Sequence, residues 1–120
     1  MRLLLTGALF GAVVCAGAPA FAADVNHGKQ LFTACQACHT EKPDSLGPSL
    51  KGVVGRKAAS LEDFRYSNAM KRANITWTEA NLREYLTDPQ GKVKGNRMPF
   101  SGLPNAGDVA DVVAYLQTLK

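Results

Sequence analysis

Two cysteines and a histidine within five residues constrain the fold of this chain more than any other feature of the sequence. Cys35 and Cys38 are separated by two residues, and His39 follows directly. Residues three apart lie on one face of a helical turn, so both thiols can reach one edge of a rigid partner. This spacing is typical of covalent attachment to haem, with the thiols bonded to the porphyrin and His39 available to bind the iron.

Two other interpretations of the cysteine pair are weaker. A redox-active disulfide of the thioredoxin type would be expected within a βαβ pattern, which the surrounding sequence does not show. A structural zinc site needs four ligands, and His27 is the only other histidine in the chain.

The first 22 residues predict a secretory signal peptide. Arg2 precedes an apolar run over residues 3–15, and Ala20-Phe21-Ala22 has the small residues that a signal peptidase accepts. The run is too short to predict a membrane span. Removal of residues 1–22 would also remove Cys15, where Val14 argues against a lipoprotein anchor. We therefore expect one mature domain, residues 23–120.

The size and charge of that domain exclude some classes of protein. The 14 basic residues fall to 13 without Arg2, against 10 acidic ones, which leaves a net charge of about +3. This charge is too weak and too dispersed to indicate nucleic-acid binding. A domain of 98 residues also has a modest core, so a covalently bound group would help to stabilise it.

The spacing of apolar residues predicts an all-α domain of about five short helices with long loops. The expected helices are one begun by Asp24, short ones near residues 61–66 and 68–73, one over residues 79–87, and a last one begun by Asn105 and Asp108. Residues 40–60 and 90–104 are rich in glycine and proline and predict loops. Such long loops suit a domain that wraps a large cofactor.

A haem iron bound by His39 has a second axial position, for which the chain offers three candidates. His27 lies on the helix that leads into the cysteine motif, so it cannot easily reach the opposite face of the haem. Met70 falls in a helical stretch where packing is the ordinary role. Met98 lies in a loop between Gly95 and Pro99, which can present its side chain freely, so we expect Met98 to be the ligand.

Several further motifs resemble the soluble class I cytochromes c, from about residue 24 to residue 119. After the cysteine motif come Leu46-Gly47-Pro48-Ser49-Leu50, Gly52-Val53-Val54-Gly55-Arg56-Lys57, Ile75-Thr76-Trp77-Thr78-Glu79, Glu84-Tyr85-Leu86, Asn96-Arg97-Met98-Pro99-Phe100 and Asp111-Val112-Val113-Ala114-Tyr115-Leu116. The resemblance implies the class I cytochrome c fold around a single haem c.

The resemblance also implies roles for residues near the haem. Pro48 would accept a hydrogen bond from His39, and Tyr85 would lie near the Met98 sulfur. A haem propionate would be held by Arg56, Tyr66 and Trp77. Gly28 would allow the first helix to cross closely against Tyr115, with Phe32 beside it. Core packing is the alternative role for the aromatic residues.

The expected function is transfer of single electrons between redox proteins in the bacterial periplasm, without catalysis, by a monomer that is not inserted in a membrane. A positive rim of Lys29, Lys42, Lys51, Lys92, Lys94 and Arg97 would favour partners with acidic surfaces. A haem enzyme or gas-binding protein, resembling a peroxidase or binding nitric oxide, is the alternative if Met98 does not bind the iron. A binding module without haem is a third possibility.

Overall fold

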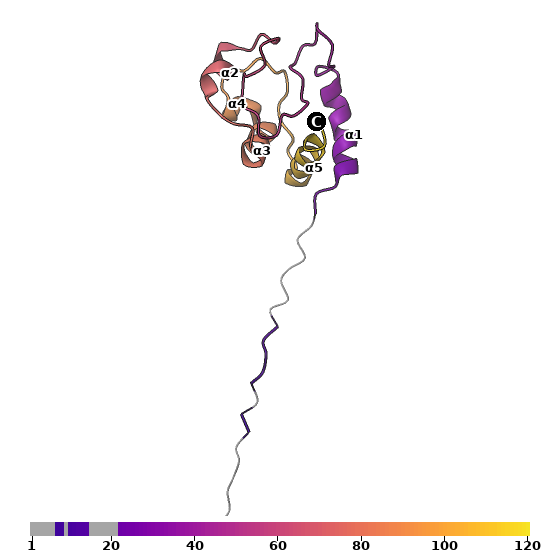
Figure 1. Cartoon of the computed structure of the whole chain (residues 1–120), viewed down its shortest axis with the longest axis vertical. Coiled ribbons are helices and arrows are strands. Elements are labelled where there is room, and N and C mark those ends of the chain that lie inside the picture. Colours follow the sequence, from indigo (N-terminus) through magenta and orange to yellow (C-terminus); the bar gives the residue numbers. More distant parts are fainter. Residues whose placement is uncertain (1–6, 9, 15–21) are drawn as a thin grey trace, which may run out of the picture.

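Five helices build the domain, in a computed structural model that describes residues 7–8, 10–14 and 22–120. They are α1 (Val25–Gln36), α2 (Asn68–Ala73), α3 (Glu79–Thr87), α4 (Pro89–Lys92) and α5 (Ala106–Leu116), and long loops join them (Figure 1). The described residues form no strand, only an isolated bridge between Lys57 and Thr76. The prediction of an all-α fold with five short helices is confirmed.

The predicted signal peptide falls largely outside the described residues. Residues 10–14 are described and form no helix. Phe10, Val13 and Val14 are almost fully exposed, so these three side chains add nothing to the core of the domain.

Helices α1 and α5 cross at close range and form one side of the domain (Figure 1). Gly28 permits this crossing, because a Cβ atom at that position would lie 2.6 Å from the carbonyl carbon of Asp111. The rings of Phe32 and Tyr115 pack beside it with their centroids 5.0 Å apart. The predicted crossing is confirmed. The buried side of α5 supplies much of the core through Val109, Val112, Val113 and Leu116.

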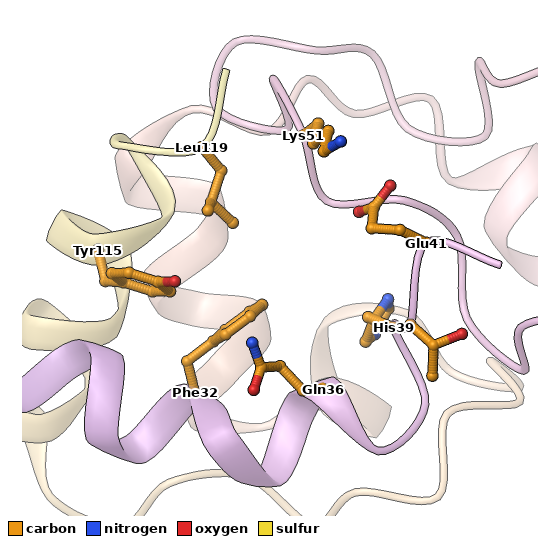
Figure 2. A pocket seen from close by; sticks show the side chains of 8 residues that line it. Phe32, Gln36, His39, Glu41, Lys51, Tyr115 and Leu119 are labelled. Atoms are coloured by element: carbon orange, nitrogen blue, oxygen red, sulfur yellow. The ribbon is translucent and has the colours of Figure 1, made fainter.

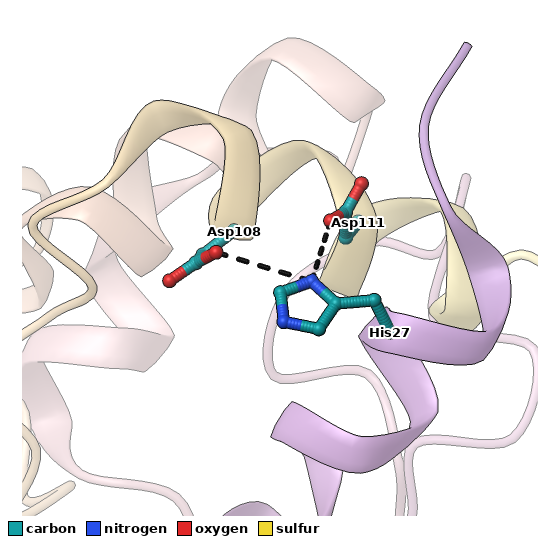
Figure 3. Close-up of side chains that lie close together, drawn as sticks. All are labelled: His27, Asp108 and Asp111. Carbon is teal, nitrogen blue, oxygen red and sulfur yellow. Dashed lines mark hydrogen bonds and ion pairs between the residues drawn. The ribbon is translucent and has the colours of Figure 1, made fainter.

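A cluster of polar side chains also joins α1 to α5. The Nδ1 atom of His27 on α1 lies 2.7 Å from a carboxylate oxygen of Asp111 on α5, and 3.9 Å from Asp108 (Figure 3). The other carboxylate oxygen of Asp111 accepts a hydrogen bond from the backbone N–H of Asp24, the residue that caps α1. The hydrogen bond to Asp111 raises the pKa of His27, and the same bond lowers the pKa of Asp111. His27 therefore ties the two helices together.

The helix predicted near residues 61–66 does not form. The Tyr66 hydroxyl accepts a hydrogen bond from the Leu61 N–H at 3.3 Å, and the rings of Phe64 and Tyr66 pack edge to face. Side chains two residues apart do not meet on a helix, so the contact between the Phe64 and Tyr66 rings requires an irregular backbone. The short helix α2 follows, as predicted, with Ser67 as its cap.

A short helix forms instead at residues 89–92, where the sequence predicted the end of a helix and a loop. Asp88 caps α4 by accepting a hydrogen bond from the Gly91 N–H, and Pro89 occupies the first turn. Proline lacks only an N–H that has no partner at that position, so it starts α4 as readily as it stops α3.

Candidate haem-binding site

The cysteine motif lies at the end of α1 and continues its winding by one tight turn. The backbone N–H groups of Cys38 and His39 both donate to the carbonyl oxygen of Cys35, at 3.1 and 3.0 Å. Both thiols are free and partly buried. Burial raises the pKa of the Cys35 thiol. The turn thus presents two thiols and one imidazole from five consecutive residues.

The loop after the motif folds back and holds this turn in place. The carbonyl oxygen of Cys38 accepts hydrogen bonds from the Gly47 N–H at 2.9 Å and from the hydroxyl of Ser45. The Ser45 oxygen in turn accepts a hydrogen bond from the Thr40 N–H at 3.0 Å. A loop of only a few residues therefore closes against the motif.

The imidazole of His39 is held in one orientation. Its Nδ1 atom lies 2.6 Å from the carbonyl oxygen of Pro48. A carbonyl oxygen can only accept, so Nδ1 carries the proton and Nε2 keeps a lone pair. Burial lowers the pKa of His39, which favours this neutral form. Gly47 packs against the ring so closely that a Cβ atom there would lie 2.5 Å from Cε1.

His39 also borders a cavity of about 280 Å³ between α1, the end of α5 and the loop that follows the motif. Figure 2 shows Phe32, Tyr115 and Leu119 along one side, with Glu41 and Lys51 on the other. The Glu41 carboxylate accepts hydrogen bonds from the Ser49 hydroxyl, which fixes one wall of the cavity. The surroundings of the imidazole are therefore apolar on the helix side and charged on the loop side.

Met98 lies in the loop between α4 and α5 and is partly buried. The hydroxyl of Tyr85, on α3, lies 3.9 Å from the Met98 sulfur. Burial raises the pKa of Tyr85 to about 12, so the phenol is neutral and can donate to the sulfur. Met70, in contrast, lies in a helix rather than a loop. Its backbone N–H belongs to the first turn of α2 and donates to the hydroxyl of the capping residue Ser67.

Of the remaining predicted site residues, Trp77 and Arg56 are hydrogen-bonded to each other, whereas Tyr66 is bonded elsewhere. The Trp77 ring packs against that of Tyr85 with their centroids 4.9 Å apart, and the backbone N–H of Trp77 donates to the Arg56 carbonyl oxygen at 2.8 Å. The Arg56 guanidinium grips the loop by donating to the carbonyl oxygens of Ser49 and Lys51. Among the described residues, the Tyr66 hydroxyl is bonded to Leu61 and to none of the other predicted site residues.

The donor set of this site fits an iron porphyrin. Two adjacent free thiols can form thioether bonds, and the imidazole offers an Nε2 lone pair on a neutral ring. Zinc fits less well, because a structural zinc site needs four ligands. In the part of the chain that the structure describes, the three His, Cys, Asp or Glu side chains placed closely enough for a metal ion are His27, Asp108 and Asp111, away from the cysteines.

Sequence reasoning assigned no role to two residues that shape this site. Gly47 lay within a motif, but nothing in the pattern showed that its hydrogen atoms face the His39 ring. Asn96 is buried and hydrogen-bonded to the backbone of Met98. The one available signal in the sequence was a polar residue two positions before the predicted ligand, Met98.

A family profile described as Cytochrome c matches residues 25–120. The chain belongs to the cytochrome c family. This assignment agrees with the geometry of the cysteine motif and places nearly all of the described domain within one family.

Named cytochromes support the assignment. Cytochrome c2 of Rhodoblastus acidophilus is 46% identical over 102 residues, which cover 82% of this chain and 95% of that protein. Cytochrome c2 of Blastochloris viridis is 41% identical over 114 residues, covering 91% of this chain and 90% of that protein. The solved structure of cytochrome cH from Methylobacterium extorquens superimposes with a TM-score of 0.75 at 41% identity, covering 79% of this chain and 98% of the other.

The protein is thus a cytochrome c2-like electron carrier with one haem c attached through Cys35 and Cys38. Its partners are redox proteins, as expected. Among the described residues, no helix of this cytochrome has the length and apolar character needed to cross a bilayer.

Proposed function

We propose that His39 and Met98 are the two axial ligands of the haem iron, and that this closed site carries one electron at a time. The observation that carries the proposal is the hydrogen bond from His39 Nδ1 to Pro48, which leaves Nε2 as the ligand atom. The Tyr85 hydroxyl beside the Met98 sulfur supports the second ligand. When bound, the haem supplies an iron that changes by one unit of charge.

The surrounding residues suit electron transfer because they limit rearrangement. His39 is fixed by Pro48 and Gly47, so the imidazole need not move when the charge of the iron changes. A neutral thioether donor from Met98 favours the reduced iron, and burial away from water acts in the same direction. With both axial positions filled by the protein, no position remains for a substrate.

We further propose that a haem propionate is held by three residues, Arg56, Tyr66 and Trp77. Arg56 uses one N–H each of Nη1 and Nη2 to bind backbone carbonyl oxygens, and a guanidinium has five N–H donors. Its remaining donors can bind a carboxylate. The backbone bond between Trp77 and Arg56 keeps the indole near that charge.

Binding of carbon monoxide to the reduced protein tests the closed site. A ligated Met98 must leave before carbon monoxide can bind, so the wild-type protein is expected to bind it weakly or slowly. Met98→Ala should bind it readily. Rapid binding by the wild-type protein would instead favour a gas-binding protein or a haem enzyme.

We also propose that residues 1–22 are a signal peptide and that the protein acts in the periplasm as a monomer. The exposure of Phe10, Val13 and Val14 supports this, because these three side chains can be removed without loss of core packing. Fractionation of cells and mass spectrometry of the purified protein would test the cleavage after Ala22. Recovery of the uncleaved chain would contradict it.

Finally, we propose that the partners of this cytochrome present acidic surfaces. Lys29, Lys42, Lys51 and Lys94 are exposed. Lys92 does not belong with them, since its ammonium group is bonded to Glu84 and Asn81. Arg97 is exposed, and one of its nitrogens donates to the Arg65 carbonyl oxygen.

A further inference from the structure

Asn96 joins the loop that carries Met98 to the end of α4. Asn96 is 8% exposed, and its side chain makes three hydrogen bonds. The Nδ2 atom donates to the carbonyl oxygens of Pro89 at 3.0 Å and Val93 at 2.9 Å. The Oδ1 atom accepts a hydrogen bond from the Met98 N–H at 2.9 Å. One buried carboxamide therefore connects a helix end directly to the backbone of Met98.

Gln90 supports the same loop from the other side. Its Nε2 atom donates to the carbonyl oxygen of Asn96 at 2.9 Å, and its Oε1 atom accepts from the Gly95 N–H at 3.1 Å. The Asn96 N–H in turn donates to Val93 at 3.1 Å. Both the side chain and the backbone of Asn96 are thus fixed to α4 and the residue that follows it.

The backbone of Met98 depends strongly on this connection. Pro99 follows Met98 and disfavours a helical backbone for it. The Met98 carbonyl oxygen accepts a hydrogen bond from the Phe100 N–H at 2.9 Å, a contact within the loop itself. The bond from the Met98 N–H to Asn96 is therefore the one that ties the Met98 backbone to a helix.

We propose that Asn96 is a positioning residue that keeps Met98 on the haem iron and restricts its exchange for other ligands. This inference rests on the proposed role of Met98 as the axial ligand. A carboxamide is suited to the task because it donates twice and accepts once at a single buried position. Aspartate would retain the acceptor but lose both donors. Alanine would remove all three bonds and leave the Met98 N–H without its partner, whereas the Pro89 and Val93 carbonyl oxygens would keep their backbone hydrogen bonds.

The effect on ligand exchange follows from which state contains the bonds. In this proposal, Met98 leaves the iron when the loop moves, and its backbone hydrogen bond to Asn96 breaks with that movement. Removing the carboxamide therefore destabilises the ligated loop more than the open one. An incoming ligand binds only the open form, so its apparent affinity rises with the population of that form.

Titration of the oxidised haem protein with imidazole measures this population. Asn96→Ala should raise the apparent association constant of imidazole by about tenfold or more, the effect expected for a buried hydrogen bond. Gln90 is exposed, so its truncation disturbs folding less. Gln90→Ala should raise the association constant of imidazole by about threefold. The affinity should increase in the order wild type, Gln90→Ala, Asn96→Ala.

Val113→Ala provides the matched control. Val113 is 2% exposed on the core side of α5, so its truncation lowers the free energy of unfolding without removing a hydrogen bond of the loop. Its imidazole affinity should remain that of the wild type. If Val113→Ala raises the imidazole affinity as much as Asn96→Ala does at equal loss of stability, Asn96 has only a structural role and the inference is wrong.

The Met98→Ala background separates this inference from the proposed function. With no methionine to displace, adding Asn96→Ala should leave the imidazole affinity unchanged. If wild-type protein already binds imidazole as tightly as Met98→Ala, Met98 does not occupy the iron and the proposed ligation fails. If the wild type binds more weakly, yet both Asn96→Ala and Gln90→Ala stay within about twofold of it, the positioning role is overturned.

Discussion

The His39 imidazole donates its Nδ1 proton to the Pro48 carbonyl oxygen across 2.6 Å, while Gly47 lies against the same ring. The two neighbouring loop residues therefore fix the ring in both tautomer and position. A side chain at residue 47 would disturb this arrangement directly.

Gly47→Ala should displace the imidazole or the loop, because the added Cβ atom would lie within 2.7 Å of both Cε1 and Nδ1. Such overpacking costs about 1–3 kcal/mol of the free energy of unfolding. We expect a lower thermal midpoint together with a changed visible spectrum of the oxidised haem. Gly55→Ala is the control, since a Cβ atom there meets nothing within 4 Å although φ is +87°. Gly55→Ala should lose stability through backbone strain and keep the wild-type spectrum. A wild-type spectrum in Gly47→Ala would show that Gly47 does not position the His39 ring.

Tyr85→Phe should lower the reduction potential. The hydroxyl, 3.9 Å from the Met98 sulfur, withdraws electron density from the thioether and so favours reduced iron. A weak hydrogen bond of about 0.5–1 kcal/mol corresponds to about 20–40 mV for one electron. Redox titration of the variant measures the shift. Tyr115→Phe, whose ring packs against Phe32, should leave the potential unchanged. An unchanged or higher potential in Tyr85→Phe would contradict the contact with the ligand.

The bond between His27 and Asp111 should make stability depend on pH. Asp111 raises the pKa of His27 above 6.5, so this contribution is complete below pH 6.5 and is lost as the pH rises through the raised value. The lowered pKa of Asp111 means that its own contribution to stability is complete above pH 3.8 and is lost as the pH falls through the lowered value. Chemical denaturation should therefore show a larger difference between wild type and His27→Gln at about pH 5.5 than at about pH 8.5.

Asn26→Gln, an exposed neutral exchange on the same helix, serves as the control for that pH series. Its stability relative to wild type should not vary over the range. A difference for His27→Gln that stays constant with pH would mean that the charge on His27 does not contribute.

The electron-transfer rate should respond to salt according to the charge of the reaction partner. Oxidation by the hexacyanoferrate(III) anion should slow as ionic strength rises, because the screening length shortens from about 30 Å at 0.01 M to about 3 Å at 1 M. Lys94→Glu should slow the reaction about twofold to tenfold at low salt. Lys120→Glu, at the exposed C-terminus, should have a smaller effect. Rates independent of salt would show that these lysines are only a solvated surface.

The sequence predicted the helices better than the loops. Asp24 and Asn105 are strong caps, and the apolar spacing after each predicted α1 and α5. Pro89 was ambiguous, since the same residue ends one helix and begins the next. The motif and the loop context singled out His39 and Met98 as predicted ligands. No periodicity could place Gly47 against His39, or Asn96 between α4 and Met98, because Gly47 and Asn96 both lie in irregular loops.

The absorption spectrum of the purified, oxidised protein tests the proposed pair of iron ligands most directly. A thioether bound to ferric iron gives a weak charge-transfer band in the far red. The band should appear in the wild type and in Met70→Ala, and it should vanish in Met98→Ala. Its absence from the wild type, or its persistence in Met98→Ala, would contradict the ligation of iron by His39 and Met98.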